Sequence, residues 1–588
     1  MRTGFYRDRA GLVSLAALAL FSQKFALAED KEGPYNIARD AYIVRYNDVF
    51  LPVVSSGAMV STQSDFATRV GIDILNREGN AIDASVAVGF ALAVTLPRAG
   101  NIGGGGFMVV HDAATNESYT IDYRETAPSG VTAGDFLDEQ GEKLDSSRFE
   151  WPAVGVPGTV AGLHKAWQKG GSLAWSDLLA PAIRLAEEGF TVNHDLAELL
   201  ASKKEWLTQN QATADSLYQA GGEPYAAGDV MRRPALARTL RLIAEKGPDV
   251  FYRGEVAEQI VSDMERFGGH IDRRDLAEYE AIVRRPIRGN YRGHEIVSMP
   301  PPSSGGIAIV EALNILENFP LQGWGYSAQS VHVMAEAMRL TFADRGNYMA
   351  DPAFFDVPAS ELTDKAYAAR RASLIRLDRA TPSAVIDGGL APFDEGYSTT
   401  HYSIVDANGT AVSNTYTLSS SFGAGLTISD TGILLNNQIH TFSVRAGIEG
   451  AEGFIASQAN RVEEGKRPVS SQSPTIVMKD GKVFLVVGSP DGSRIITAVI
   501  QMIVNVIDFR MNVAEATNQR RIHHQWIPDI LEVEPGFNLD TLSLLESRGH
   551  KVEQSFNMGS TQSIQVGAHY LFGASDPRRP NALTLGTE

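Results

Sequence analysis

Residues 399–417 read Thr-Thr-His-Tyr-Ser-Ile-Val-Asp-Ala-Asn-Gly-Thr-Ala-Val-Ser-Asn-Thr-Tyr-Thr, and this stretch decides the fold. Two runs rich in β-branched and aromatic residues flank Asn408-Gly409, a pair that is typical of the tight turn in a β-hairpin. Folding this hairpin places Thr417 within about one residue of the position opposite Thr399. The sequence therefore predicts two threonine hydroxyls side by side on neighbouring strands.

Thr399 becomes a strong nucleophile if the peptide bond before it is cut. The cut leaves a free α-amine beside the hydroxyl, so one residue then supplies both the nucleophile and the general base of an acyl transfer. Taken alone, a Thr-Thr pair at the start of a strand is better explained by plain β-propensity. The motifs elsewhere in the chain must decide between these two interpretations.

A second predicted hairpin leads into a glycine-containing turn. Its strands cover residues 473–478 and 483–487, and the chain continues as Gly488-Ser489-Pro490-Asp491-Gly492-Ser493-Arg494 before an apolar helix pattern over 495–507. A strand, a turn and a helix N-terminus aim free backbone N–H groups at one point, which is what an oxyanion hole needs. Viewed in isolation, the same segment is an ordinary loop with a serine N-cap.

Together these segments resemble the gamma-glutamyltransferase (gamma-glutamyltranspeptidase) family over nearly the whole chain after residue 28. The matching motifs, in the family's order, are Gly79 to Ala84, Asn101 to Met108, Asp122 to Glu125, Gly155 to Thr159, Thr399 to Ser403, Leu434 to Gln438, Lys466 to Ser471, Gly488 to Arg494 and Gly559 to Ser563.

The resemblance implies an N-terminal nucleophile hydrolase, made as one inactive chain that cuts itself between Ser398 and Thr399. Residues 1–28 would be a signal peptide, residues 29–398 the large subunit and residues 399–588 the small catalytic subunit. The implied fold class is α+β, a four-layer αββα sandwich with two β-sheets between two layers of helices.

The resemblance also assigns expected roles in catalysis. Thr399 is the expected nucleophile, its α-amine is the base, and Thr417 supports that amine. The backbone N–H groups of Asp491 and Gly492 are the expected oxyanion donors.

The donor-binding residues follow from the same resemblance. Arg124 is expected to bind the donor's α-carboxylate with help from Ser470 and Ser471, and a guanidinium suits this role because its planar fork binds a carboxylate bidentately. Gln438 is expected at the donor's α-amino end.

Four positions depart from the usual family pattern. Ser419 stands where many members carry Asn, Asp491 replaces the first of two glycines in the oxyanion loop, and Ser398 replaces the common Gln before the cut. Thr441 matters most, since the typical member has there the Asp that pairs with the donor's ammonium. We therefore expect that the site still binds the donor's α-carboxylate but binds its α-ammonium more weakly. The exception would be an Asp491 carboxyl that points inward and replaces the lost charge.

Three functions are compatible with these residues. The first is a gamma-glutamyl transferase and hydrolase acting on glutathione-like donors, with water or an amine as acceptor. The second is an acylase of the same family that prefers glutaryl-type donors, such as glutaryl-cephalosporins, which lack the α-amine. The third is an uncleaved, inactive chain that binds a carboxylate ligand, and the retention of Thr399, Thr417 and Arg124 disfavours it. None of the three implies a metal or an organic cofactor.

The N-terminus and the composition restrict location and partners. Residues 1–28 combine three arginines, an apolar run and the small-x-small site Ala26-Leu27-Ala28, as a secretory signal does. The run is too short to span a bilayer, so we expect a periplasmic or secreted protein without a stable membrane anchor. The absence of cysteine excludes disulfides and thiolate metal sites, and the formal charge of −18 argues against a nucleic-acid partner.

Other conspicuous segments have plainer explanations. Gly103 to Gly106 favours tight backbone packing over phosphate binding, because no Lys-Ser/Thr follows. Ala84 to Leu96 favours a helix packed inside the protein, and His523-His524 a helix surface. His401 is expected to pack beneath the site, and residues 446–460 are expected to form a mobile loop that resembles the lid of some family members.

Overall fold

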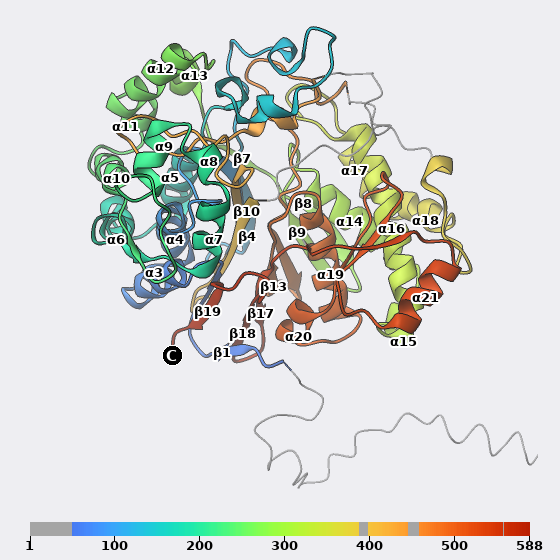
Figure 1. The fold of residues 1–588 in the computed structure, drawn as a ribbon. Helices are drawn as coiled ribbons and strands as arrows, with labels where there is room; N and C mark the ends of the chain where they lie inside the picture. Colours follow the sequence, from blue (N-terminus) through green and yellow to red (C-terminus); the bar gives the residue numbers. More distant parts are fainter. Residues whose placement is uncertain (1–49, 387–397, 445–457, 557) are drawn as a thin grey trace, which may run out of the picture. The chain divides into compact units, whose positions relative to one another are not determined.

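The structure, a computed structural model, describes residues 50–386, 398–444, 458–556 and 558–588. The predicted signal peptide and most of the predicted 446–460 loop lie outside these ranges. Residues 52–588 form a unit in which two seven-stranded sheets lie between layers of helices (Figure 1). This arrangement confirms the predicted α+β class and the four-layer sandwich.

Sheet I contains the predicted nucleophile hairpin at its centre. Its strand order is β19-β2-β10-β11-β3-β4-β7. The strand bounds are β2 Met59–Thr62, β3 Gly105–Asp112, β4 Glu117–Tyr123, β7 Ile282–Arg284, β10 Ser398–Val405, β11 Ala411–Ser419 and β19 Leu583–Gly586. Every neighbouring pair in this order is antiparallel.

Sheet II contains the second predicted hairpin and has the order β1-β18-β17-β13-β12-β9-β8. Its strands are β1 Val53–Ser55, β8 Ile287–Tyr291, β9 His294–Ser298, β12 Thr475–Lys479, β13 Lys482–Val487, β17 Gln562–Val566 and β18 Leu571–Ser575. Alternate side chains of the two sheets, among them Val109 and Val405 from sheet I and Ile476 and Val486 from sheet II, share one buried apolar cluster. The two sheets therefore pack face to face.

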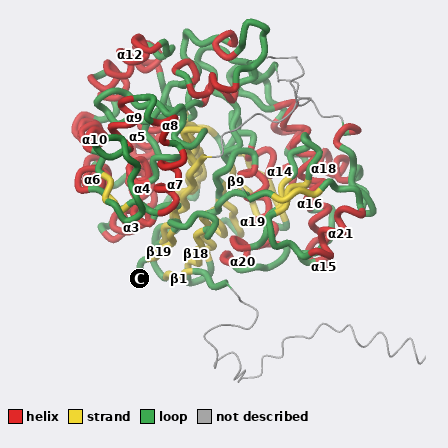
Figure 2. Tube along the Cα trace, in the orientation of Figure 1, coloured by secondary structure: helices red, strands yellow, loops and turns green. Residues whose placement is uncertain are grey.

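Helices cover the outer face of each sheet (Figures 1 and 2). On the sheet I side lie α3 Asp65–Asn76, α4 Ala81–Thr95, α5 Thr159–Gly170, α6 Trp175–Glu188, α7 His194–Ser202, α8 Lys204–Leu207, α9 Gln211–Leu217, α10 Pro234–Lys246, α11 Asp249–Tyr252, α12 Glu255–Phe267 and α13 Arg273–Glu278. On the sheet II side lie α14 Gly305–Leu316, α15 Leu321–Trp324, α16 Ala328–Tyr348, α17 Ala359–Leu362, α18 Lys365–Ala372, α19 Arg494–Ile507, α20 Val513–Asn518 and α21 Leu539–Ser547. Among the described helices, none is long and apolar enough to cross a membrane.

Helix α4 anchors the nucleophile hairpin. Every one of its side chains is buried, which confirms the predicted internal helix. The helix begins at Asn80, whose side chain accepts from the N–H of Asp83 while the Asp83 carboxylate accepts from the Asn80 N–H. The hydroxyls of Tyr402 in β10 and Tyr416 in β11 donate to backbone carbonyls of α4, each at 2.8 Å. These two hydrogen bonds fix the position of the hairpin along the axis of α4.

The glycine run at the start of β3 is required by close backbone packing, as predicted. A methyl group added at Gly103, Gly104, Gly105 or Gly106 would come within 2.1 to 2.4 Å of a backbone carbonyl oxygen of a neighbouring segment. These oxygens belong to residues that include Thr417 and Tyr123. The run therefore brings the strands on either side of β3 close to one another at the end of the sheet where Thr417 lies.

The prediction for His523-His524 is wrong. His523 ends the short strand β14 (Ile522–His523), which pairs with β15 (Leu531–Val533), and both histidines are buried. His523 forms hydrogen bonds with Thr497 and Gln525, and His524 lies 3.3 Å from Asp529. Because both rings have polar groups of the protein beside them, burial overrides the surface preference that the pair alone suggests. Burial lowers the pKa of His524 to about 4, so the ring is neutral near pH 7.

Substituting the glycine run tests this packing. Gly106→Ala should destabilise the protein by roughly 1–3 kcal/mol, because the new methyl group meets backbone atoms that cannot move aside. Gly323→Ala in α15 is the matched control, since a methyl group there has open space. Thermal unfolding should show a lowered midpoint for Gly106→Ala only; equal midpoints for both variants would contradict the packing account.

Candidate active site

Thr399 and Thr417 lie opposite each other in the β10–β11 hairpin, as predicted. The Thr399 hydroxyl donates to the Thr417 Oγ1 at 3.3 Å, and the N–H of Ser419 donates to the same oxygen at 2.8 Å. The Thr417 hydroxyl then has its own hydrogen left to donate, and it does so to the carbonyl oxygen of Ser398 at 2.5 Å. That carbonyl belongs to the peptide bond predicted to be cut.

A β-bulge produces this contact. Ser398 pairs with Ser419 while Thr399 pairs with Thr417, so Leu418 is an extra residue on β11. Ser419 has a φ of 83°, in the left-handed region that a non-glycine residue seldom adopts. The bulge turns the N–H of Ser419 toward the Thr417 hydroxyl, and the Ser398 hydroxyl is held by the carbonyl of Arg98 at 2.9 Å.

His401 packs beneath the two threonines, as predicted. It is fully buried, and its ring forms hydrogen bonds with the hydroxyls of Thr415 at 2.8 Å and Ser403 at 3.1 Å. Burial lowers its pKa to about 3, so the ring is neutral at physiological pH. A methyl group at Gly488 would come within 2.3 Å of this ring. The start of the predicted oxyanion loop therefore lies directly against the strand that carries Thr399.

The predicted oxyanion loop connects β13 to α19. Its Asp491 and Gly492 both have left-handed backbones, with φ values of 88° and 55°. Their carbonyl oxygens accept from Arg494 and Ile495 at the start of α19. Within the described ranges, neither the N–H of Asp491 nor that of Gly492 donates a hydrogen bond. Two adjacent backbone donors thus remain available, as the prediction requires.

The Asp491 carboxylate does not replace the charge missing at Thr441. Its Oδ1 accepts from Arg579 at 2.9 Å, and its Oδ2 accepts from the N–H of Gly559 at 3.0 Å. Asp491 is buried, and a buried carboxylate needs such partners. The Asp491–Arg579 pair therefore ties the oxyanion loop to the C-terminal segment of the chain.

Arg124 lies at the same end of sheet I as Thr399. It follows Tyr123, which pairs with Gly106, while the adjacent Gly105 pairs with Thr417. Neighbouring strands lie about 4.8 Å apart, so Arg124 starts roughly three strand spacings from the β10 strand. Its guanidinium is buried and donates to the carbonyls of Pro468 and Val469 at 3.1 and 3.0 Å.

The predicted serine pair follows those two carbonyls. Ser470 accepts on its hydroxyl from the N–H of Gln472 at 3.1 Å, and Ser471 accepts from the guanidinium of Arg345 at 2.8 Å. Arg345 is buried in α16 and also donates to Ser304. Sequence reasoning missed Arg345, because a single arginine within a helix has no distinguishing pattern.

The predicted amine end of the site is built from a short 3₁₀ turn, Gln438–Thr441. The Thr441 hydroxyl donates to the carbonyl of Gln438 at 2.7 Å and accepts from the Gln438 side-chain amide at 3.3 Å. Among the described residues, no donor reaches the buried Gln438 Oε1 or the buried Ser419 Oγ. Two unpaired acceptor oxygens therefore accompany a threonine whose hydroxyl is used within its own turn.

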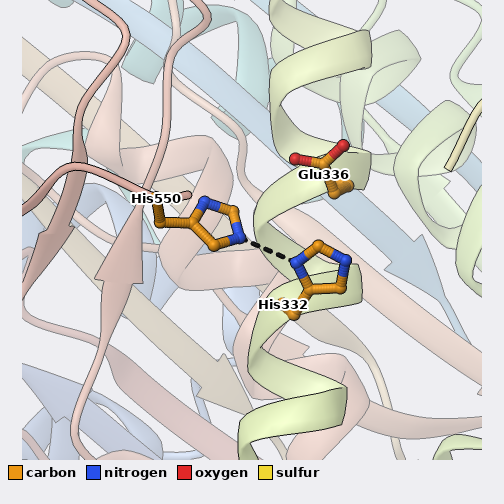
Figure 3. A group of neighbouring side chains, drawn as sticks. All are labelled: His332, Glu336 and His550. Carbon is orange, nitrogen blue, oxygen red and sulfur yellow. Dashed lines mark hydrogen bonds between the residues drawn. The ribbon is translucent and has the colours of Figure 1, made fainter. Parts of the chain in front are cut away.

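One group of side chains in the described part of the chain has the composition of a metal site: His332, Glu336 and His550 (Figure 3). His332 forms a hydrogen bond from Nε2 to the carbonyl of Arg376 at 2.7 Å, so its Nδ1 accepts from His550 Nε2, also at 2.7 Å. Two nitrogens on one zinc ion would lie about 3.3 Å apart, given Zn–N bonds near 2.05 Å in a tetrahedron. The spacing fits a shared proton between two neutral rings that join α16 to the C-terminal region.

Arg579 and Asp491 can be tested together. Arg579→Met should destabilise the protein by roughly 2–4 kcal/mol, because it leaves the buried Asp491 carboxylate without its cation; the partial exposure of Arg579 keeps the value below that of a fully buried pair. Adding Asp491→Gly should recover more than half of this loss in denaturant unfolding, since glycine accepts the left-handed backbone and leaves no charge. Additive losses in the double variant would contradict a direct pair.

Comparison with known proteins identifies the relatives of this chain. The gamma-glutamyltranspeptidase family model matches residues 67–585. The glutathione hydrolase proenzyme of Escherichia coli strain K12 is 51% identical and covers 92% of this chain and 93% of its own length. The acylase ACY 1 proenzyme of Pseudomonas sp. strain SE83 is 37% identical and covers 86% of this chain and 88% of its own length.

A solved structure shows the same fold. The crystal structure of cephalosporin acylase from Bacillus halodurans has a TM-score of 0.82 and 28% identity, and it covers 96% of this chain and 100% of that chain. Because the family model covers residues 67–585 and a relative at 51% identity is covered almost end to end, this chain belongs to the gamma-glutamyltranspeptidase family.

Proposed function

We propose that this protein is a glutathione hydrolase and γ-glutamyl transferase, made as a proenzyme and acting through Thr399. The observation that carries the proposal is the Thr417 hydroxyl, which contacts both the Thr399 hydroxyl and the Ser398 carbonyl. The 51% identity to a glutathione hydrolase proenzyme over most of both chains supports the same activity.

Self-cleavage begins when the Thr399 Oγ1 attacks the carbonyl carbon of Ser398. The Thr417 hydroxyl already donates to that carbonyl and stabilises the negative charge that develops on its oxygen. The nitrogen of Thr399 takes the proton that its hydroxyl gives up, the C–N bond breaks, and an ester between Ser398 and the Thr399 oxygen remains together with a free α-amine. Water hydrolyses the ester and yields a large subunit ending at Ser398 and a small subunit beginning at Thr399.

In the mature enzyme, the freed α-amine of Thr399 takes the proton from its own hydroxyl as the oxygen attacks the donor's γ-carbonyl. The N–H groups of Asp491 and Gly492 stabilise the tetrahedral oxyanion. The leaving amine takes a proton and departs, and a γ-glutamyl ester on Thr399 remains. Water completes a hydrolysis, and the amine of an amino acid or dipeptide completes a transfer.

The donor's α-carboxylate binds at Arg124, with Ser470 and Ser471 beside it. Arg124 is held in place by two backbone carbonyls, so it loses little freedom when the donor binds. The donor's amine end lies at Gln438 and Ser419, whose free acceptor oxygens suit an ammonium group.

A glutaryl-type acylase is the second candidate function. Thr441 favours it, because its hydroxyl is engaged within the Gln438–Thr441 turn and carries no charge for an ammonium. The 37% identity to an acylase proenzyme is consistent with this alternative. For either function, the signal-like residues 1–28 support export to the periplasm or the medium.

Thr399→Ala should leave a single full-length chain, because the attacking oxygen is gone. Thr400→Ala is the neighbouring control and should still be processed. Intact-mass analysis after purification distinguishes the two. Cleavage before residue 399 in Thr399→Ala would remove Thr399 from its proposed role.

Thr441→Asp should raise the preference for γ-glutamyl over glutaryl donors by roughly tenfold to a hundredfold, since a hydrogen bond to a charged group contributes about 1.5–3 kcal/mol. The measurement is the ratio of kcat/KM values for γ-glutamyl and glutaryl amides that share one chromogenic leaving group. Thr441→Asn has the same shape without the charge and should give a much smaller change. A ratio that stays flat or falls in Thr441→Asp would show that residue 441 does not contact the donor's amine end.

A further inference from the structure

Glu125 carries a buried carboxylate that the reaction described above does not use. The residue is 0% exposed, and within the described ranges no other residue donates a hydrogen bond to either of its carboxylate oxygens. Its ion-pair partner is Arg124, whose Nη1 lies 3.5 Å from Glu125 Oε2. Because burying a charge without hydrogen bonds is costly, two unpaired carboxylate oxygens require an explanation.

The Glu125 carboxylate lies next to the set of paired residues that runs across sheet I through Thr399. A methyl group at Gly105 would come within 2.9 Å of Glu125 Oε2. Gly105 pairs with Thr417, and Thr417 pairs with Thr399. The carboxylate is therefore one strand away from the threonine pair on the side of Arg124.

Glu125 also borders the turn that forms the amine end of the site. A methyl group at Gly155 would lie 3.0 Å from Glu125 Cβ and 3.2 Å from Ile439 Cδ1. Ile439 follows Gln438, and the N–H of Gln438 and the N–H of Gly155 are both bound by the side-chain oxygen of Asn436. Glu125 thus lies between Arg124 and the Gln438–Thr441 turn.

This position suits the head group of an α-amino acid. In the donor, one carbon atom carries both the α-carboxylate and the α-ammonium, so the two charges are close neighbours. Arg124 and Glu125 offer the complementary charges 3.5 Å apart. We propose that Glu125 receives the donor's α-ammonium in this protein, in place of the aspartate absent at Thr441. The inference rests on the proposed γ-glutamyl activity and names the residue that sets its donor preference.

Nearby carboxylates are already paired. Asp491 is held by Arg579, and Asp122 is held by Arg467 and Arg284, both at 2.8 Å. An ammonium group has three N–H donors. Glu125, Gln438 and Ser419 supply three sets of buried acceptor oxygens that lack donors in the described structure.

Ionisation of Glu125 gives the pairing a pH signature. Burial raises its pKa to about 7, while the charge of Arg124, the backbone N–H of Glu125 itself and the charge of Arg467 oppose this shift and Asp122 adds to it. Tyr123 and Tyr279 also interact electrostatically with Glu125, and both stay protonated because burial raises their pKa. Below pH 7 the carboxyl becomes neutral and pairs poorly with an ammonium. The preference for γ-glutamyl donors should therefore fall as the pH drops through 7.

The experiment compares γ-glutamyl and glutaryl amides that share one chromogenic leaving group. Glu125→Gln should lower the γ-glutamyl to glutaryl ratio of kcat/KM by roughly tenfold to a hundredfold, through a higher KM for the γ-glutamyl donor. The glutaryl value should not fall, because the variant removes a charge that competes for Arg124. Glu117→Gln, at the exposed start of strand β4, which ends two residues before Glu125, is the control.

A double variant distinguishes binding from a structural role. In a Thr441→Asp background, Glu125→Gln should lower the γ-glutamyl to glutaryl ratio of kcat/KM much less than it does in the wild type, since the introduced aspartate supplies the charge. Equal losses for both donors, or an unchanged ratio, would overturn the proposal while leaving the γ-glutamyl activity intact. If Glu125→Gln does not fold, the wild-type ratio measured from about pH 5.5 to about pH 8.5 decides, and a ratio without a change near pH 7 overturns the proposal. A wild-type enzyme that hydrolyses neither amide would contradict the proposed function itself.

Discussion

The hydrogen bonds of the Thr417 hydroxyl are the constraint on which the site depends. One oxygen accepts from Thr399 and from the N–H of Ser419, and its hydrogen is donated to the Ser398 carbonyl. A hydroxyl has one donor and two acceptor positions, so this arrangement uses all of them. In the proposed function, the same contact orients Thr399 and polarises the carbonyl of the bond to be cut, and it forms at the bulge at Leu418.

The rest of the fold holds that contact in place. Tyr402 and Tyr416 fix the hairpin on the buried helix α4, and the glycine run of β3 lets the strands beside it approach closely. The predicted oxyanion loop follows β13 of sheet II, and its first residue, Gly488, packs against the His401 ring below Thr399. The proposed nucleophile and the proposed oxyanion donors thus come from segments of two different sheets that face each other.

Local patterns were sufficient to predict both hairpins, helix α19 and the pairing of Thr399 with Thr417, because turn residues and alternation act over short distances. They were insufficient for the arginine contacts that link distant segments, one an ion pair and the other a hydrogen bond. Arg579 meets Asp491 across 88 residues, and Arg345 meets Ser471 across 126. No local signal marks such partners. Only the three-dimensional structure shows that Asp491 is paired with Arg579 and that, in the described part of the chain, no other residue donates a hydrogen bond to the Glu125 carboxylate.

The central claim is that Thr399, freed by cleavage, carries the acyl group. The most direct test is rapid quenching of the processed enzyme with a γ-glutamyl amide, followed by mass analysis of the small subunit. The account predicts a small subunit that begins at Thr399 and gains the mass of one γ-glutamyl group, with fragmentation placing the adduct on that residue. An adduct on any other residue, or a small subunit that begins elsewhere, would contradict it.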